Sequence, residues 1–215
     1  MARNKYPEET VKLIIDEAQK LFMQKGYEDT SIQDIIDHLG GLSKGAIYHH
    51  FKSKEEIFEA VCQKIGEDNA VFYDRIRDDK TQNGREKLRT MFSSACTNPS
   101  NDVVRALTAK ILSDPKFLTN QIEEIYTVVA PQYVQPMIEE GIRDGSIKTE
   151  YPKELAEVII TLGNIWINPI IAYSDAEGIR GKVEFFSMLL KKLDLDIFDQ
   201  ELIEQYVQYF GHYKT

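Results

Sequence analysis

The sequence has few cysteines and no long apolar run. Cys62 and Cys96 are its only cysteines, 34 positions apart, and no second pair is present to complete a zinc site. We interpret both as small core residues. The longest uncharged run, residues 158–174, has 17 residues with two asparagines and a proline inside, whereas a membrane span needs about 20 predominantly apolar residues. We therefore expect a helix packed against protein, and no membrane partner.

Signals for secretion and for enzymatic chemistry are also lacking. Residues 1–20 carry charges every few positions and have no uninterrupted apolar region, so we expect a cytoplasmic protein. The chain has no H-E-x-x-H or G-x-x-x-x-G-K-[ST] motif. Residues 41–45, GLSKG, have the spacing G-x-S-x-G, but no predicted strand precedes them to form a nucleophile elbow. His49 and His50 are adjacent, which on a helix turns them about 100° apart and prevents them from sharing a metal. We expect a protein that is not an enzyme and that has no cofactor and no metal site.

The composition is that of a folded globular chain. It has 215 residues, of which 42% are hydrophobic and 28% are charged, and a formal net charge of -9. This length is enough for one large core or two small ones. Apolar residues recur at intervals of three and four almost throughout, and sustained two-residue alternation is absent. The sequence therefore predicts an all-α fold.

Glycines and prolines divide the predicted helices. The first helix ends at Lys25, and Gly26 after it suits a left-handed cap. Two short helices are expected within residues 30–53, followed by a long helix from about residue 54 into the 70s and by helices at 84–98, 101–113, 117–143, 152–173, 179–193 and 199–210. Pro131 and Pro136 lie inside the 117–143 segment, which is therefore expected to kink or break.

The stretch TSIQDIIDHLGGLSKGAIYHHFKSKEEIF, residues 30–58, contains the two short helices and the turn between them. Thr30 and Gln33 fit a capping box at the start of the first helix. Gly40 and Gly41 supply permissive backbone for a sharp turn. The stretch thus predicts helix, glycine turn and helix.

The second short helix is predicted to have an apolar inner face and a basic outer face. Ser43 fits its cap, and Ile47 and Phe51 stand four residues apart and so share the face that packs on the preceding helix. The outer face would then carry Lys44, Gly45, Ala46, Tyr48 and His49.

The start of the long helix adds a predicted phosphate site. Ser53 and Glu56 form a second capping box, whose first turn offers backbone N–H groups beside Lys54. Residues 43–54 hold three lysines, two histidines and no acidic residue, so the local field is positive although the chain is acidic. This arrangement is typical of a helix-turn-helix, whose second helix enters the major groove of DNA. The alternative is a helical protein-interaction module that does not read DNA, because glycine-turn hairpins are common.

Through SKGAIYHHFKSKEEIF and the preceding FMQKGYEDTSIQDI, about 50 residues resemble the TetR family of bacterial transcriptional regulators. The resemblance implies a helix-turn-helix DNA-binding domain at residues 1–53 and a larger helical domain for ligand binding and dimerisation at residues 54–215. It implies DNA contacts by Thr30, Ser43, Lys44, Gly45, Ala46, Tyr48, His49, Lys52 and Lys54. The family has a single glycine in the turn, so Gly40-Gly41 looks like one extra residue that would tilt the second helix.

The resemblance also implies a homodimeric repressor that binds a palindromic DNA operator and is released by a small-molecule effector. Helices near 152–173 and 179–193 are expected to form the dimer interface, because each carries a broad apolar stripe. The stripe residues are Ala156, Ile159, Ile160, Gly163, Trp166, Ile167, Ile170, Ile171, Val183, Phe186, Leu190 and Leu193. The alternative is that these stripes fill the core of the monomer.

A ligand cavity is expected next to the proline-containing segment 117–143, because a kinked helix packs imperfectly. Its expected lining residues are Met91, Phe92, Tyr126, Tyr133 and Trp166. These side chains predict an apolar or aromatic effector.

Overall fold

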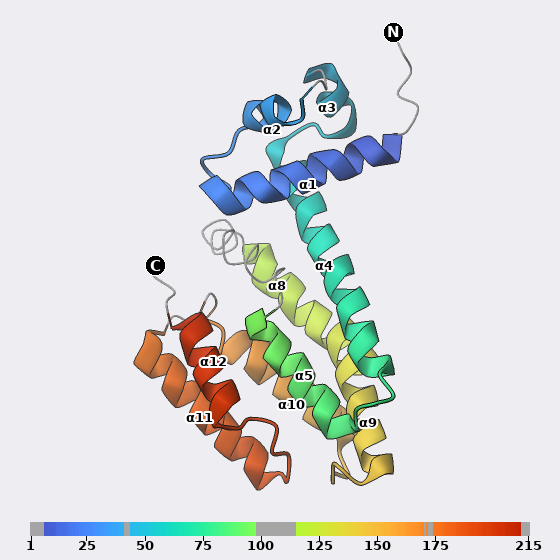
Figure 1. Ribbon diagram of the computed structural model, residues 1–215, viewed down its shortest axis with the longest axis vertical. Coiled ribbons are helices and arrows are strands. Elements are labelled where there is room, and N and C mark those ends of the chain that lie inside the picture. Colours follow the sequence, from blue (N-terminus) through green and yellow to red (C-terminus); the bar gives the residue numbers. More distant parts are fainter. Residues whose placement is uncertain (1–6, 41–43, 98–114, 170, 172–173, 212–215) are drawn as a thin grey trace. The chain divides into compact units, whose positions relative to one another are not determined.

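The computed structural model of the protein describes residues 7–40, 44–97, 115–169, 171 and 174–211. In these residues the secondary structure is helical, which confirms the predicted all-α fold (Figure 1). The elements are α1 (Pro7–Lys25), α2 (Ile32–His38), α3 (Lys44–His50), α4 (Lys54–Asp78), α5 (Gly84–Thr97), α8 (Pro115–Glu124), the π-helix η1 (Ile125–Val134), α9 (Gln135–Asp144), α10 (Pro152–Thr161), the π-helix η2 (Leu162–Trp166), α11 (Ala176–Lys192) and α12 (Gln200–Phe210). The helix predicted at 101–113 lies outside the described residues.

The described residues form two compact units, which divide within α4, between Ala70 and Val71. The first unit contains α1, α2, α3 and the first part of α4, and the second contains the end of α4 and the elements from α5 onward. The functional boundary that the sequence suggested, after residue 53, stays a prediction. Among the described helices, none is long and apolar enough to cross a membrane.

The core of the first unit forms where the apolar faces of its helices meet. Ile14 and Phe22 of α1, Ile35 of α2, Ile47 of α3 and Ile57 of α4 all have an exposed fraction of 0%. Full burial of each such side chain contributes about 1.5–3 kcal/mol. Helix α1 ends as predicted, because Gly26 takes a left-handed φ of 82° directly after Lys25. The short helices α2 and α3 thus rely on this shared core, since helices of one or two turns are marginal alone.

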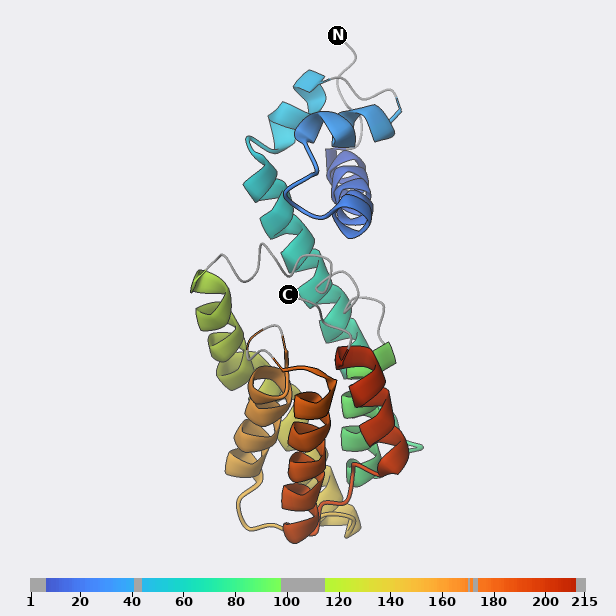
Figure 2. The ribbon, with the colours of Figure 1, turned by 90° about the vertical axis from the view of Figure 1, so that its left-hand side faces the viewer.

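The second unit is a bundle in which helices far apart in sequence lie side by side. Helix α5 packs on α9, η1 on α10, and α11 on α12 (Figures 1 and 2). Its core contains a chain of aromatic rings in which Phe92, Phe186 and Phe198 lie 5.3–5.8 Å apart between ring centroids. The hydroxyl of Tyr206 extends this cluster by donating to the Phe92 carbonyl at 3.0 Å.

The proline-containing segment is continuous through Pro131 and Pro136, so the predicted break is wrong, and the predicted kink stays a prediction. Helix α8 passes into η1, which contains Pro131, and η1 passes into α9, which has Pro136 in its first turn. At the end of η1 the Gln135 N–H donates to the Ala130 carbonyl five residues back. Wider turns of this kind are found at irregular positions in helices. They accommodate the proline, which has no N–H to donate.

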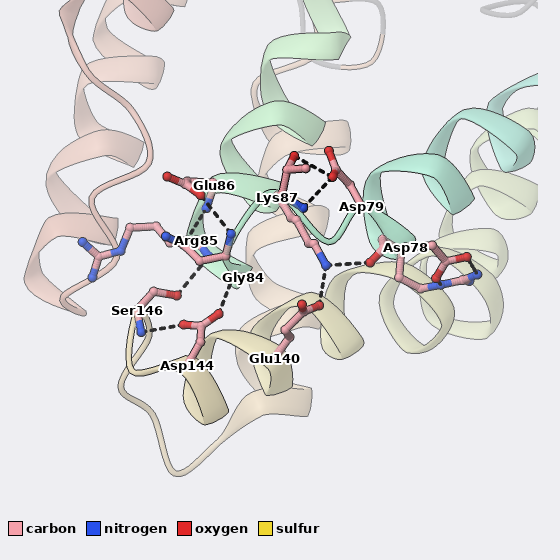
Figure 3. Close-up of polar contacts among 12 residues, drawn as sticks. Asp78, Asp79, Gly84, Arg85, Glu86, Lys87, Glu140, Asp144 and Ser146 are labelled. Carbon is pink, nitrogen blue, oxygen red and sulfur yellow. Dashed lines mark hydrogen bonds and ion pairs between the residues drawn. The ribbon is translucent and has the colours of Figure 1, made fainter.

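A fully satisfied helix start fixes α5 against α9. The Gly84 and Arg85 N–H groups donate to Asp144 Oδ2 and to Ser146 Oγ, and the Glu86 N–H donates to Asn83 Oδ1 (Figure 3). Next to them, the buried ammonium of Lys87 donates to Glu140 of α9 and to the Arg77 carbonyl at the end of α4. One corner of the second unit is therefore held by polar contacts.

The apolar stripes that were expected to form a dimer interface mostly fill the core of the monomer. The buried members are Ala156, Ile159, Ile160, Ile167, Val183, Phe186 and Leu190. Gly163 packs on the ring of Phe92, Trp166 and Ile171 are half-buried, Leu193 is exposed, and Ile170 lies outside the described residues. For these buried residues the expected dimer interface is wrong, because η1 packs on α10 and α12 packs on α11 within the same chain.

Candidate nucleic-acid interface

The first short helix begins one residue later than predicted. Its N-cap is Ser31, whose hydroxyl accepts from the Asp34 N–H at 3.1 Å, while the Asp34 carboxylate accepts from the Ser31 N–H at 2.8 Å. Hydrogen bonds from Ser31 and from Lys25 hold the pKa of Asp34 below its ordinary range. The capping box is therefore Ser31 with Asp34, and the predicted box of Thr30 with Gln33 is wrong.

Thr30 faces the interior of the first unit. Its side chain is 1% exposed, and its hydroxyl lies 2.7 Å from the Gly26 carbonyl and 3.4 Å from that of Leu21. Through these contacts the hydroxyl joins the last turn of α1 to the glycine that follows it. We therefore correct its expected role: Thr30 closes the end of α1 and, in this conformation, does not reach a phosphate.

Helix α3 has the two faces that its sequence predicted. Ile47 is 0% exposed and Phe51 is buried directly after the helix. The opposite face is turned outward: Lys44, Gly45 and His49 are exposed, Tyr48 is 43% exposed and Ala46 is half-buried. Ser43, the predicted cap, lies outside the described residues.

Two side chains on the outer face of α3 lie together. The Lys44 ammonium is 5.8 Å from the centre of the Tyr48 ring, one turn further along the helix. A cation over an aromatic face is attracted to it. A lysine at the first turn and a tyrosine at the second present a charge and a flat, polar-tipped ring to the same exterior surface. Such groups contact phosphates and base edges in major-groove readers.

The start of α4 has the predicted cap, but the exposed lysine beside it is Lys52 and not the predicted Lys54. The Ser53 hydroxyl accepts from the Glu56 N–H at 3.2 Å, and the Glu56 carboxylate accepts from the Lys52 N–H at 2.7 Å. The side chain of Lys52 is exposed. In contrast, the ammonium of Lys54 donates to the Tyr27 carbonyl at 2.8 Å. The structure therefore supports Lys52 as a candidate phosphate contact more directly than Lys54.

The turn between α2 and α3 is partly described. Gly40 has a φ of 42°, in the region that favours glycine, directly after Leu39 at the end of α2. Gly41 lies outside the described residues. The tilt expected from a second glycine stays a prediction.

The five residues expected to line a ligand cavity are spread over the second unit. Met91, Phe92 and Tyr133 are buried in its core, Trp166 is half-buried with its ring 5.9 Å from that of Phe185, and Tyr126 is 47% exposed. A hollow of about 220 Å³ lies elsewhere, lined by Phe72, Arg89, Thr90, Ser93, Ser94 and Thr97. None of the five expected residues lines this hollow, and its hydroxyl-rich wall differs from the apolar lining that was expected. Within the described residues, no group of three or more metal-ligating side chains gathers to hold a metal ion.

Comparison with known proteins shows that the chain is similar to bacterial transcriptional regulators. The family model described as bacterial regulatory proteins, tetR family, matches residues 14–61. The repressor KstR2 of Mycolicibacterium smegmatis is 32% identical over 143 residues, which are 64% of this chain and 67% of that protein. The uncharacterised regulator YhgD of Bacillus subtilis is 28% identical over 155 residues, which are 70% of this chain and 78% of that protein. These relatives are named as transcriptional regulators rather than enzymes.

Solved structures share the fold over most of the chain. A TetR-family regulator from Pectobacterium atrosepticum is 22% identical and has a TM-score of 0.62, with 89% of this chain and 97% of that one covered. A regulator from Cytophaga hutchinsonii is 20% identical with a TM-score of 0.64, and the match covers 94% of this chain and 92% of that one. The similarity therefore extends beyond residues 14–61 to the helices of the second unit.

Proposed function

Since the chain belongs to the TetR family of bacterial regulatory proteins, we propose that it is a repressor that binds a palindromic DNA operator as a homodimer and is released by a small-molecule effector. A cytoplasmic location, where bacterial DNA is accessible, is part of this proposal. The proposed interface is the outer face of α3, with Lys44, Gly45, Tyr48 and His49, together with Lys52 before α4.

The observation that carries the proposal is the exposure of Lys44 and Tyr48 opposite the buried Ile47. A helix whose inner face is fixed by a core presents its outer side chains in a constant arrangement, as reading of base edges requires. The acidic net charge is compatible with this role, because specific contacts require a positive surface only at the interface, whereas bulk charge affects non-specific binding.

The homodimer is proposed to form through α10 and α11, by their exposed face. Val158 of α10 is 47% exposed, and Phe185 and Met188 of α11 are 52% and 50% exposed. Large apolar side chains that a folded monomer leaves in water are common at subunit interfaces. Two helices from each chain form a four-helix bundle around a two-fold axis, which is the arrangement that we propose.

Release by an effector requires two conformations with different affinities for the operator. We propose that effector binding in the second unit favours the conformation in which the two α3 helices of the dimer no longer match the operator half-sites. These half-sites lie about 34–36 Å apart, or at multiples of that spacing, for two-fold symmetric readers. Only an effector that binds the two conformations with different affinity shifts the equilibrium.

A selection of genomic DNA fragments tests the proposal. The native protein is compared with a Lys44→Ala, Tyr48→Ala variant, and both are checked for the same melting temperature. Recovery of one palindromic sequence by the native protein alone supports operator binding. If neither protein enriches any sequence at low salt, the proposal fails and the interaction module that does not read DNA becomes the better explanation of the α3 surface.

A further inference from the structure

Lys54, the first residue of α4, is bound to the turn that follows α1. Its ammonium donates to the Tyr27 carbonyl at 2.8 Å and to the Glu28 carbonyl at 3.3 Å. The same nitrogen lies 4.1 Å from the centre of the Tyr27 ring, so a cation–π contact adds to the hydrogen bonds. Two carbonyls and one ring thus surround this charge inside the first unit.

Glu55 holds the same turn from the next position of α4. The Tyr27 hydroxyl donates to Glu55 Oε1 at 2.7 Å. Burial, followed by the nearby Glu55 carboxylate, raises the pKa of Tyr27 above its ordinary value, so the phenol keeps its proton as the donor. The backbone and the side chain of Tyr27 are therefore both bound by the first turn of α4.

The contacts of Lys54 connect the residues before α2 with the residues after α3. Tyr27 and Glu28 lie between α1 and α2, and Lys54 follows closely on α3. Helices α2 and α3 follow each other in the sequence, so the contacts of Lys54 join the two ends of the α2–α3 pair. Movement of α3 relative to α1 would have to lengthen or break these hydrogen bonds.

We infer that Lys54 is a positioning residue, which holds the α2–α3 pair in register for DNA through the Tyr27 and Glu28 carbonyls, and is not a phosphate contact. The inference rests on the proposed DNA-binding function. Lys52, two positions earlier, has the same charge but an exposed side chain, and so serves as the matched control.

The first test needs no DNA. Amide hydrogen exchange is measured on the native protein and on Lys54→Met and Lys52→Met variants. The Thr30 N–H donates to the Tyr27 carbonyl at 3.3 Å and reports on the turn. Faster exchange in residues 26–31 of Lys54→Met alone supports the inference. Unchanged exchange in that variant overturns it.

The second test uses the double-stranded sequence that the genomic selection recovers and a scrambled duplex of equal length. For a phosphate contact, removal of the charge from both protomers of the proposed dimer weakens binding to both duplexes and reduces the slope of log affinity against log salt by about 0.9 per contact, or roughly 1.8 in all. We expect this result for Lys52→Met. For Lys54→Met we expect an unchanged slope and a roughly tenfold fall in the ratio of specific to non-specific affinity, because misplaced helices lose base contacts.

A Lys54→Arg variant separates positioning from unfolding. Arginine keeps the charge and can donate to two carbonyls while stacking on a ring, so it is expected to restore the native ratio. A slope that falls in Lys54→Met as it does in Lys52→Met would assign Lys54 to a phosphate instead. If the native protein recovers no sequence, only the proposed function fails. The exchange experiment still decides whether Lys54 holds the turn through the Tyr27 and Glu28 carbonyls.

Discussion

The ammonium of Lys87 lies 2.5 Å from Glu140 Oε2, although the Lys87 side chain is 0% exposed. The same ammonium donates to the Arg77 carbonyl at 2.8 Å, so one buried charge joins α4, α5 and α9 (Figure 3). Removal of one member of a buried pair costs more than the pair contributes, since it leaves a charge without its partner.

The two partners should therefore differ in the cost of their removal. Glu140→Ala leaves the enclosed ammonium of Lys87 without a counter-charge and is expected to cost about 3–5 kcal/mol of unfolding free energy. Lys87→Met leaves the Glu140 carboxylate, which still reaches solvent, and is expected to cost about 1–3 kcal/mol. Urea denaturation followed by circular dichroism compares the two variants. Equal losses would contradict the assigned asymmetry.

Gly84 is expected to tolerate no side chain. A Cβ at this position would lie 2.2 Å from the Gly141 nitrogen and 2.3 Å from the Met137 carbonyl oxygen, both backbone atoms that cannot move aside. We expect Gly84→Ala to destabilise the protein by about 3 kcal/mol or more. Gly181→Ala is the control, because that Cβ meets nothing within 4 Å and should stabilise α11 by up to about 1 kcal/mol. Thermal melts of both variants decide the matter.

Substitutions on the outer face of α3 should weaken DNA binding without changing stability. Lys44 and Tyr48 are exposed, so Lys44→Ala and Tyr48→Ala remove few packing contacts. Each removes one contact from each protomer of the proposed dimer, at about 1–3 kcal/mol per contact, and is therefore expected to raise the dissociation constant for the selected duplex by roughly thirtyfold or more. Fluorescence anisotropy measures the affinity. Lys20→Ala on α1 should bind like the native protein, and an equal loss there would point to a general charge effect.

The exposed apolar side chains of α11 should matter for assembly. Phe185→Asp puts a charge where the proposed dimer has an apolar contact, so the variant is expected to be monomeric in light scattering after size-exclusion chromatography. Leu13→Asp provides the control, since Leu13 is 55% exposed on α1 of the first unit. Loss of dimer in both variants, or in neither, would argue against the proposed interface.

The unfolding free energy should decrease at alkaline pH, in part because the Cys96 thiol ionises more readily in the unfolded chain. Burial raises the pKa of this thiol to about 12, whereas an unfolded thiol ionises near about 8.5. The unfolded chain therefore loses a proton that the folded chain keeps, so this contribution is complete below about pH 8.5 and is lost as the pH rises toward 12. We expect Cys96→Ala to flatten the decline in unfolding free energy between roughly pH 8 and pH 10.5. An identical decline in both proteins would rule this contribution out.

The periodicity of apolar residues predicted helix ends and helix faces correctly where nearby residues in the sequence determine them. The stop after Lys25, the buried Ile47 and the exposed Tyr48 follow from spacing alone. The cap of α2 was missed because Thr30 and Ser31 both fit a capping box, and only burial of the Thr30 hydroxyl under α1 selects Ser31.

Long-range contacts account for the other errors. The ammonium of Lys54 binds carbonyls more than twenty positions earlier, and no local spacing indicates such a contact. Likewise, an apolar stripe identifies the face of a helix that avoids water, but not the partner that covers it. For Ile159 and Phe186 this partner is the same chain.

The π-helix η1 also determines which residues of α9 face α5. From Ile125 to Gly141 one row of buried positions recurs every four residues, at Ile125, Val129, Tyr133, Met137 and Gly141, and a second row beside it contains Ala130, Val134 and Ile138. In a straight α-helix a four-residue repeat advances in phase by about 40° each time, or roughly 160° over the four steps. Wider turns cancel this drift. A single-residue deletion within η1 that restored ordinary α-helical turns would thus rotate Gly141 away from Gly84, so the close crossing of α5 and α9 depends on the extra width several residues earlier.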